Sequence, residues 1–470
     1  MSNSSTQLVV IGGGPGGYTA AFYAADLGMQ VTLIDPAVNP GGVCLYRGCI
    51  PSKALLHVAD VLNEAKHADA WGITFGAPKI DVDRLRAFKT KVVSQLTGGL
   101  GQLSKQRKVN YIRGTAAFRD AKSLDITTEG GRETLTFEHA IIATGSEPSK
   151  VPGLSLESPR VMDSTGALDL PDIPGSLLVI GGGYIGLELG SVYAAVGTKV
   201  TVVEMTGGLL PGADRDLVNI LARRIDSICE AVLLNTKVVA MKEENDGIAV
   251  TFESSEGRQD QRFDRVLVSV GRRPSAIPGV DTTKVVVSKR GFVEVDERRR
   301  TAEPSIYAIG DVAGEPMLAH KAFHEARVAV EAIAGHKVAY EPLAIPAVVF
   351  TDPELAWCGL TEGEAHQAKR EITVTRFPWA ASGRALTLDR PDGMTKLVLD
   401  PKTERVLGVG IVGPGAGELI AEGVLAVEMG ANATDMKMTI HPHPTLSETL
   451  MESAETFFGH ATHIYRPRRK

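Results

Sequence analysis

The chain has 470 residues, enough for two to four domains, and its 43% hydrophobic and 23% charged content is ordinary for a globular protein. A formal net charge of −6 argues against nucleic acid as the main partner, and two short basic runs, residues 298–300 and 466–470, are expected to be solvated. No stretch reaches the roughly 18 apolar residues of a membrane span. The N-terminus shows no leader pattern, so we expect a cytoplasmic protein.

One glycine motif occurs twice, each time between two short apolar runs. The first copy has a predicted strand at 7–11, a helix over 18–27 and a strand at 31–34 that ends at Asp35. The second has strands at 177–180 and 200–203 and ends at Glu204. The acidic residue follows the first glycine by 23 positions in both copies (35 − 12 and 204 − 181). Each copy therefore predicts a β-α-β dinucleotide-binding unit with G-x-G-x-x-G spacing, formed by Gly12, Gly14 and Gly17 and by Gly181, Gly183 and Gly186.

The remaining segments complete two such units and add a third region. Long helices are expected over 52–66 and 82–106, and strands at 140–143 and 265–270 close the two units. From about residue 345 the pattern changes, with a strand at 396–399 and a helix over 418–429. We predict an α/β fold with two tandem Rossmann-like domains and a C-terminal α+β domain, divided as 1–148, 149–275, 276–344 and 345–470.

Glu204 predicts which nucleotide the second unit binds. A carboxylate at this strand end accepts hydrogen bonds from ribose hydroxyls and repels a 2′-phosphate. The next residues, 205–208, contain no arginine that would offset this repulsion. The second unit is therefore expected to prefer NAD over NADP.

Two of the four cysteines, Cys44 and Cys49, lie with four residues between them in the segment GGVCLYRGCIPSK. Such a pair can cycle between dithiol and disulfide, and Pro51 suits a helix start that would lower the pKa of Cys49. Lys53 falls on the same helix face as Cys49, where it either stabilises a thiolate or is simply solvated. Cys229 and Cys358 are isolated, which favours buried positions over a metal site.

A second cluster, His441 to Glu448, reads HPHPTLSE. A histidine oriented by a carboxylate is a common general acid/base, but histidines in proline-rich surface turns are also common. Sequence spacing does not show whether this cluster meets the cysteines.

The segments GGVCLYRGCIPSKALLH, YAIGDVAGEPMLAHKA and HPHPTLSE, together with both glycine motifs, resemble the dihydrolipoamide dehydrogenases. These enzymes belong to the FAD-dependent pyridine nucleotide–disulfide oxidoreductases, and the likeness runs from about residue 7 to residue 458. It implies FAD-binding segments at 1–148 and 276–344, an NAD-binding domain at 149–275 and a dimerisation domain at 345–470.

The resemblance also implies a role for each site residue. Cys44 would be the interchange thiol, Cys49 the thiolate in contact with the flavin, and Lys53 and Glu188 an ion pair near it. His443 of the other subunit, oriented by Glu448, would be the acid/base. The residues expected at the FAD site are Gly12, Gly14, Gly17, Asp35, Lys53, Ala116, Thr144, Gly145, Ser146, Asp311, Met317, Leu318, Ala319 and His320. Those expected at the NAD site are Gly181, Gly183, Tyr184, Ile185, Gly186, Glu204, Val238 and Gly271.

The implied reaction is oxidation of carrier-bound dihydrolipoamide by the cysteine pair, with electrons passing through FAD to NAD⁺. The implied partners are a second copy of the chain, a lipoyl carrier domain and the acyltransferase core of a 2-oxoacid dehydrogenase or glycine-cleavage complex. Other readings remain open: a reductase for another disulfide or mercuric ion, or a docking subunit without catalysis. The chain departs from the usual family pattern at Asp35, Tyr46, Arg47, Tyr184, Phe323 and His324.

Overall fold

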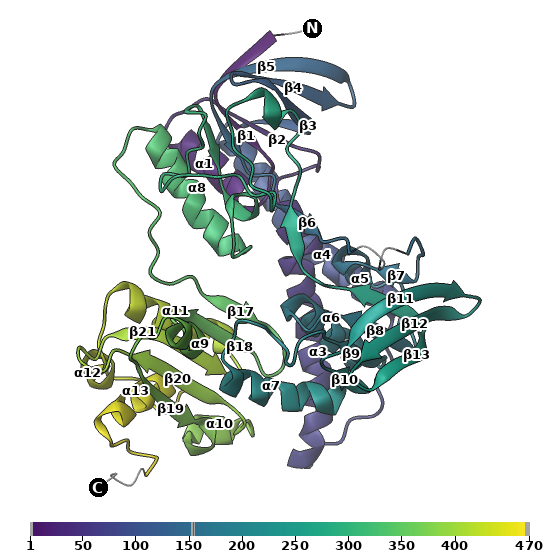
Figure 1. Cartoon of the computed structure of the whole chain (residues 1–470), viewed down its shortest axis with the longest axis vertical. Helices are drawn as coiled ribbons and strands as arrows, with labels where there is room; N and C mark the ends of the chain where they lie inside the picture. The colour runs from purple at the N-terminus through teal and green to yellow at the C-terminus, as the bar shows by residue number, and fades with distance from the viewer. Residues whose placement is uncertain (1–2, 152–153, 155, 466–470) are drawn as a thin grey trace.

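Two parallel β-α-β units organise two separate sheets in the computed structural model, which describes residues 3–151, 154 and 156–465 (Figure 1). The first unit is β1 (Asn3–Ile11), α1 (Pro15–Asp26) and β2 (Val31–Asp35). The second is β8 (Ser176–Ile180), α6 (Tyr184–Ala195) and β9 (Lys199–Val203). Both predicted units are confirmed. The first helix begins earlier than expected, because Pro15 suits the first helical turn.

The first sheet is completed by a strand from much later in the chain. Strand β1 lies between β2 and β5 (Gly131–Ile142), and β16 (Ile306–Ala308) pairs with β5 in parallel. Strand β3 (Asn110–Asp120) lies beside β2, and β4 (Ser123–Thr128) joins β3 to β5 in antiparallel pairing. The second unit is therefore inserted within the first. Helix α1 packs against α8 (Ala319–Ile333) on one face of this sheet (Figure 1).

The second sheet is wholly parallel in the order β10-β9-β8-β14-β7, with added strands β10 (Ala231–Leu233), β14 (Arg265–Val268) and β7 (Val161–Met162). An antiparallel ribbon packs its apolar side chains against this sheet and consists of β11 (Lys237–Glu244), β12 (Gly247–Ser254) and β13 (Gly257–Phe263). The two crossings between the units, β6 (Ser146–Pro148) and β15 (Arg272–Pro274), pair with each other. This pairing ties the two nucleotide units together.

The C-terminal sheet is antiparallel in the order β17-β18-β21-β20-β19. Its strands are β17 (Ala347–Val349), β18 (Leu355–Gly359), β19 (Thr373–Pro378), β20 (Met394–Leu399) and β21 (Val406–Val412). Helix α7 (Arg215–Ile228) of the second unit covers one face and α13 (Glu448–Glu455) the other. Neighbouring residues of β20 show this: Thr395 bonds Thr449 of α13 at 2.7 Å, and Lys396 bonds Asp214 beside α7 at 2.6 Å. The sheet therefore separates α13 from the second unit.

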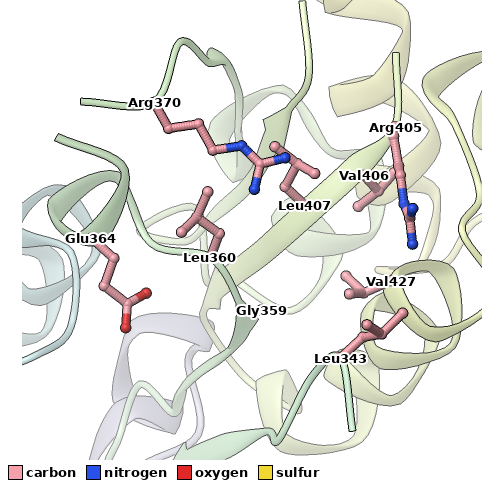
Figure 2. Close-up of a pocket in the computed structure, with 9 residues that line it drawn as sticks. All are labelled: Leu343, Gly359, Leu360, Glu364, Arg370, Arg405, Val406, Leu407 and Val427. Atoms are coloured by element: carbon pink, nitrogen blue, oxygen red, sulfur yellow. The ribbon is translucent and has the colours of Figure 1, made fainter. Parts of the chain in front are cut away.

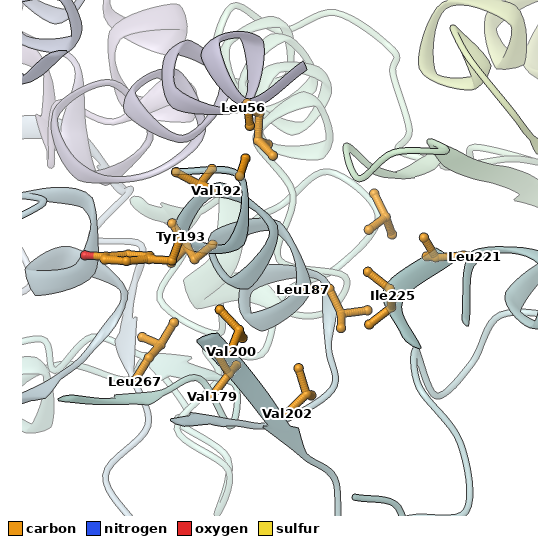
Figure 3. Close-up of a cluster of buried hydrophobic side chains, with 14 of the residues drawn as sticks. Leu56, Val179, Leu187, Val192, Tyr193, Val200, Val202, Leu221, Ile225 and Leu267 are labelled. Carbon is orange, nitrogen blue, oxygen red and sulfur yellow. The ribbon is translucent and has the colours of Figure 1, made fainter. Parts of the chain in front are cut away.

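The two long helices expected within the first domain are α3 (Cys49–His67) and α4 (Val82–Gln106). Helix α3 packs along α6, where Leu56 of α3 lies beside Val192 of α6 in a shared cluster of buried side chains (Figure 3). This packing brings the start of α3 beside the middle of α6. The shorter helices are α2 (Gly42–Arg47), α5 (Ser164–Leu168), α9 (Glu362–Gln367), α10 (Gly383–Thr387), α11 (Ala416–Glu428) and α12 (Ala433–Met438).

The prediction that the basic run at 298–300 is solvated is wrong for one of its residues. Arg298 and Arg300 are exposed, but Arg299 pairs with the fully buried Glu325 at 3.1 Å. A buried carboxylate needs a positively charged partner. The sequence alone does not show which arginine of the run provides it. The run at 466–470 lies outside the described residues. In the described part of the chain, no helix is long and apolar enough to cross a membrane.

Candidate active site

The glycine motifs shape two open helix N-termini. Gly12 and Gly181 have φ of +104° and +108°, which L side chains rarely adopt, so glycine is required at both turns. A Cβ added at Gly17 would lie 1.8 Å from the Gly12 carbonyl oxygen, whereas one added at Gly183 would meet nothing within 4 Å. The third glycine therefore allows close packing, and the second leaves room above the helix. Neither α1 nor α6 has a side-chain cap, so their first N–H groups are available to a phosphate.

Asp35 and Glu204 hold these turns in the same way. The Asp35 carboxylate accepts hydrogen bonds from the backbone N–H groups of Gly13 at 2.6 Å and Ala37 at 2.9 Å. The Glu204 carboxylate accepts those of Gly182 and Thr206, both at 2.8 Å. Both carboxylates are buried at strand ends, where the sequence predicts ribose contacts.

The side chains expected near the flavin come together from three segments. Ser146 donates a hydrogen bond to Asp311 at 2.5 Å, and Arg272 donates to the Ser146 hydroxyl at 2.8 Å. The Thr144 hydroxyl, just after β5, is buried without a hydrogen-bond partner. Gly145 has φ of +71° between them. Thr144 is thus an unsatisfied polar group next to the first glycine turn, because a Cβ added at Gly12 would lie 3.2 Å from the Thr144 backbone nitrogen.

Met317 and Leu318 precede α8, which begins at Ala319 without a side-chain cap. His320 instead contacts the carbonyl of Pro346 at 2.8 Å, and burial lowers its pKa. Behind this turn, the buried Glu325 accepts the Gly310 N–H at 2.6 Å and pairs with Lys321 at 3.0 Å. Glu325 therefore fixes the turn that carries Asp311, a role for which the sequence has no local signal.

The remaining predicted cofactor residues are distributed over both units. Ala116 faces Ile126 in the β3–β4 pairing, and Val238 is buried at the start of β11. Gly271 has φ of +107° between β14 and β15, and Ile185 lies in the first turn of α6. Tyr184 also begins α6; burial raises its pKa to about 12.

The structure holds Cys44 and Cys49 as two free thiols, on α2 and at the start of α3. The Cys44 thiol donates a hydrogen bond to the Cys49 sulfur, and this lowers the pKa of Cys49 to about 7 against the opposing effect of desolvation. The Lys53 ammonium acts in the same direction, and the pKa of Cys44 is raised because its proton is held in the hydrogen bond. Cys49 is therefore the more acidic thiol of the pair, as its helix N-terminal position predicts.

Lys53 is not a solvated lysine. Its ammonium lies 2.7 Å from Glu188 Oε2 on α6, and Ser52 donates to the same oxygen at 3.0 Å. The other oxygen of this buried carboxylate accepts the backbone N–H of Phe350 at 3.0 Å. The contacts of Ser52 and Phe350 with Glu188 were not predicted. The sequence offered one signal for them, the hydroxyl of Ser52 next to Lys53.

His443 and Glu448 form the expected dyad, with Nδ1 and Oε1 2.9 Å apart. Glu448 also accepts the Thr445 N–H at 2.8 Å, and this bond together with His443 lowers the pKa of Glu448 despite desolvation. The His443 side chain is 72% exposed. Across the described residues, no hydrogen bond or ion pair joins this dyad to Cys44 or Cys49.

Family models match nearly the whole chain. Residues 6–326 match the model for pyridine nucleotide-disulphide oxidoreductase, and residues 345–454 match the dimerisation domain of the same enzymes. The chain belongs to the pyridine nucleotide-disulphide oxidoreductase family. Members of this family use FAD and NAD(H), and the glycine turns, the unpartnered Thr144 hydroxyl and the two buried carboxylates fit such nucleotides.

Among relatives in this oxidoreductase family, the dihydrolipoyl dehydrogenase of Vibrio cholerae is 48% identical, with 97% of each chain covered. That of Geobacillus stearothermophilus is 45% identical, covering 98% of this chain and 97% of the relative. Two solved structures share the fold. LpdA from Mycobacterium tuberculosis has a TM-score of 0.89 at 25% identity, covering 96% of this chain and 99% of that one. The HOCl-induced flavoprotein disulfide reductase RclA from Escherichia coli, as a Cu(II) complex, has a TM-score of 0.86 at 29% identity with the same coverage.

Two other features of this oxidoreductase do not belong to the thiol site. Asp214, Asp216 and Glu362 come close enough to resemble a cation site, but the Lys396 ammonium already pairs with all three. A cavity of about 450 Å³ lies in the C-terminal domain, with Arg370 and Arg405 over an apolar floor that includes Leu360 and Leu407 (Figure 2). None of the residues predicted for catalysis or cofactor binding lines it.

Proposed function

We propose that this chain oxidises protein-bound dihydrolipoamide to lipoamide and reduces NAD⁺, as a dihydrolipoyl dehydrogenase. The observation that carries the proposal is the placement of the thiol pair: Cys44 on α2 and Cys49 at the start of α3 are free thiols, and Lys53 of α3 pairs with Glu188 at 2.7 Å. The hydrogen bond from the Cys44 thiol, together with the Lys53 charge, lowers the pKa of Cys49. The curated relatives with that name, at 42–48% identity over nearly the full chain, support the choice of substrate. The acidic Glu204 supports NAD over NADP.

In the proposed reaction, the dyad accepts a proton from the substrate and the two cysteines carry out the thiol–disulfide exchange. His443 accepts the proton of one dihydrolipoamide thiol, and the resulting thiolate attacks the Cys44 sulfur of the Cys44–Cys49 disulfide. Cys49 leaves as a thiolate, stabilised by Lys53. The second substrate sulfur then attacks the mixed disulfide and its proton passes to the departing Cys44 sulfur, which closes the lipoamide ring and returns Cys44 as a thiol, while the first proton stays on His443. Two substrate thiols are oxidised and one protein disulfide is reduced, so electrons balance.

The nucleotides supply the rest of the redox chemistry. Bound FAD would supply the two-electron chemistry that links the dithiol to NAD⁺. Gly12, Gly14 and Asp35 would hold its adenosine half, and Ser146, Asp311 and the N-terminus of α8 its flavin half. Gly181, Gly183 and Glu204 would hold NAD⁺. The carboxylate of Glu188 anchors Lys53 on the thiol side of this site.

The dyad is proposed to act on the thiols of a second copy. In its own chain the C-terminal sheet lies between α13 and the second nucleotide unit, and the His443 ring is largely exposed. A homodimer formed through residues 345–470 would turn this ring towards a partner's cysteines. The lipoyl group is proposed to arrive on a carrier domain of another chain, within a 2-oxoacid dehydrogenase or glycine-cleavage complex.

The test is NAD⁺ reduction by the purified flavoprotein with dihydrolipoamide. Rapid NADH formation is expected, and Cys44→Ser should abolish it. Cys229→Ser is the matched control, because Cys229 is isolated and half-buried and should be dispensable. No turnover with dihydrolipoamide, but reduction of glutathione disulfide or another disulfide, would keep the cofactors and overturn the substrate.

A further inference from the structure

Phe350 reaches the thiol site from the C-terminal domain. It follows β17, and its backbone N–H donates to Glu188 Oε1 at 3.0 Å. Its ring centroid lies 4.5 Å from the Lys53 ammonium. The Glu188 carboxylate is thus held on one oxygen by Ser52 and Lys53 of α3, and on the other by a residue from a different domain.

The ring restricts where the Lys53 charge can be. The Lys53 side chain is 33% exposed, so positions directed towards water are open to it. A cation over an aromatic face within about 6 Å is attracted by the ring quadrupole. Glu188 and the Phe350 ring together therefore favour the one ammonium position that lies close to both Glu188 and Cys49.

Phe350 is itself firmly held. Thr351 donates a hydrogen bond to the Pro353 carbonyl at 2.9 Å, and Asp352 pairs with Arg224 of α7 at 3.3 Å and also with Arg390. These bonds hold the backbone that follows Phe350, and the partly buried Phe350 side chain packs against the hydrophobic cluster that includes Leu187 and Leu355. The ring can therefore act as a fixed wall for its neighbours.

We propose that Phe350 is a positioning residue for the redox centre: its ring and backbone N–H fix the Lys53–Glu188 pair, so that the C-terminal domain sets the charge beside Cys49. The groups that face the Cys49 sulfur are Cys44, Lys53, Glu188, Tyr18 and Tyr184. Of these, the ring of Phe350 contacts Lys53. The inference concerns the thiolate and does not depend on which disulfide is the substrate.

The test measures the Cys49 thiolate in the FAD-loaded Cys44→Ser enzyme, where Cys49 is the one thiol of the pair. The long-wavelength charge-transfer absorbance of the bound flavin is titrated against pH. Phe350→Leu keeps an apolar side chain and the backbone N–H but removes the ring face, and its midpoint should rise by roughly half a pH unit. Phe350→Tyr keeps the ring and should titrate like the parent.

A double-mutant cycle separates positioning from general damage. With Lys53→Met in place, Phe350→Leu should produce no further shift, because the charge that the ring holds is gone. Flavin content and the thermal midpoint are measured for each variant, and Phe350→Met replaces the leucine variant if that one loses FAD. Coincident midpoints for Phe350→Leu and its parent, or an unchanged shift in the Lys53→Met background, would overturn the proposal.

Discussion

Asp35 and Glu204 accept equivalent hydrogen bonds 169 residues apart (204 − 35), each from the residue after the first glycine of its motif. Each carboxylate also accepts a hydrogen bond from the backbone N–H two residues after itself, which is that of Ala37 for Asp35 and that of Thr206 for Glu204. The internal repeat therefore extends from spacing to individual contacts. Asp35 does so with the shorter side chain, so the departure from the family pattern at this position keeps both contacts with the turn.

Glu204→Gln is expected to weaken NAD⁺ binding and to reduce the preference for NAD⁺ over NADP⁺. Loss of a charged hydrogen-bond acceptor should raise the KM for NAD⁺ by a factor of about 10. The neutral amide would also no longer repel a 2′-phosphate. Steady-state kinetics with both nucleotides measures this change. Asp35→Asn is the matched control: it should lower FAD retention and leave the KM for NAD⁺ unchanged. Equal KM changes in the two variants would contradict the assignment of the two units.

Lys53→Met and Glu188→Gln are expected to shift the pKa of Cys49 in opposite directions. In the intact site the pKa of Cys49 is about 7; the Lys53 charge lowers it and the Glu188 charge raises it. The thiolate is present above this pKa and is protonated as pH falls through it. Its charge-transfer absorbance should therefore appear at higher pH in Lys53→Met and at lower pH in Glu188→Gln. Shifts in the same direction would show that the pair acts through packing rather than charge.

The repeat and the thiol pair were predictable from sequence because each is local. Cys49 and Pro51 lie within one helical turn, so spacing determines which face they share. The choice of His443 and Glu448 from the cluster was implied only by family resemblance, because spacing does not separate His443 from His441, which pairs with Glu422 at 2.8 Å. The pairing of Lys53 with Glu188 was implied only by family resemblance, since 135 residues separate them. Spacing alone left Lys53 undecided.

Phe350, Glu325 and Arg299 carried no local pattern, and their roles come from packing between segments that are distant in the sequence. A buried charge such as Glu325 becomes recognisable only when its partners, Lys321 and Arg299, are placed around it. The sequence around Phe350 does not indicate that its backbone N–H meets the carboxylate of Glu188.

Lys396→Met should destabilise the contact between the second unit and the C-terminal domain. Lys396 is 1% exposed and pairs with Asp214, Asp216 and Glu362, so its loss leaves three neighbouring carboxylates with less compensation. Removal of one partner from a buried ion pair costs about 3 kcal/mol, seen as a lower urea midpoint. Arg262→Ala, in the exposed pair with Asp246, is the control and should cost less than about 0.5 kcal/mol. Equal midpoints for the two variants would contradict a buried network.

A hybrid dimer decides which chain's thiols His443 serves. Combining a Cys44→Ser chain with a His443→Gln chain, each carrying a different affinity tag, gives two possible results. If each dyad acts on the other chain's thiols, one site has both defects, and the other has intact thiols and an intact His443. The hybrid should then keep about half of the wild-type activity, although each parental homodimer loses about 100-fold or more.

If each dyad acted within its own chain, both sites of this hybrid would be defective and no activity would return. A hybrid of Cys44→Ser and Cys49→Ser chains is the control, because both of its sites lack a complete thiol pair in either arrangement. The sheet between α13 and the second unit leads us to expect recovery in the first hybrid and none in the control. Recovery would also require a dimer in solution, since separate chains cannot complement each other's sites.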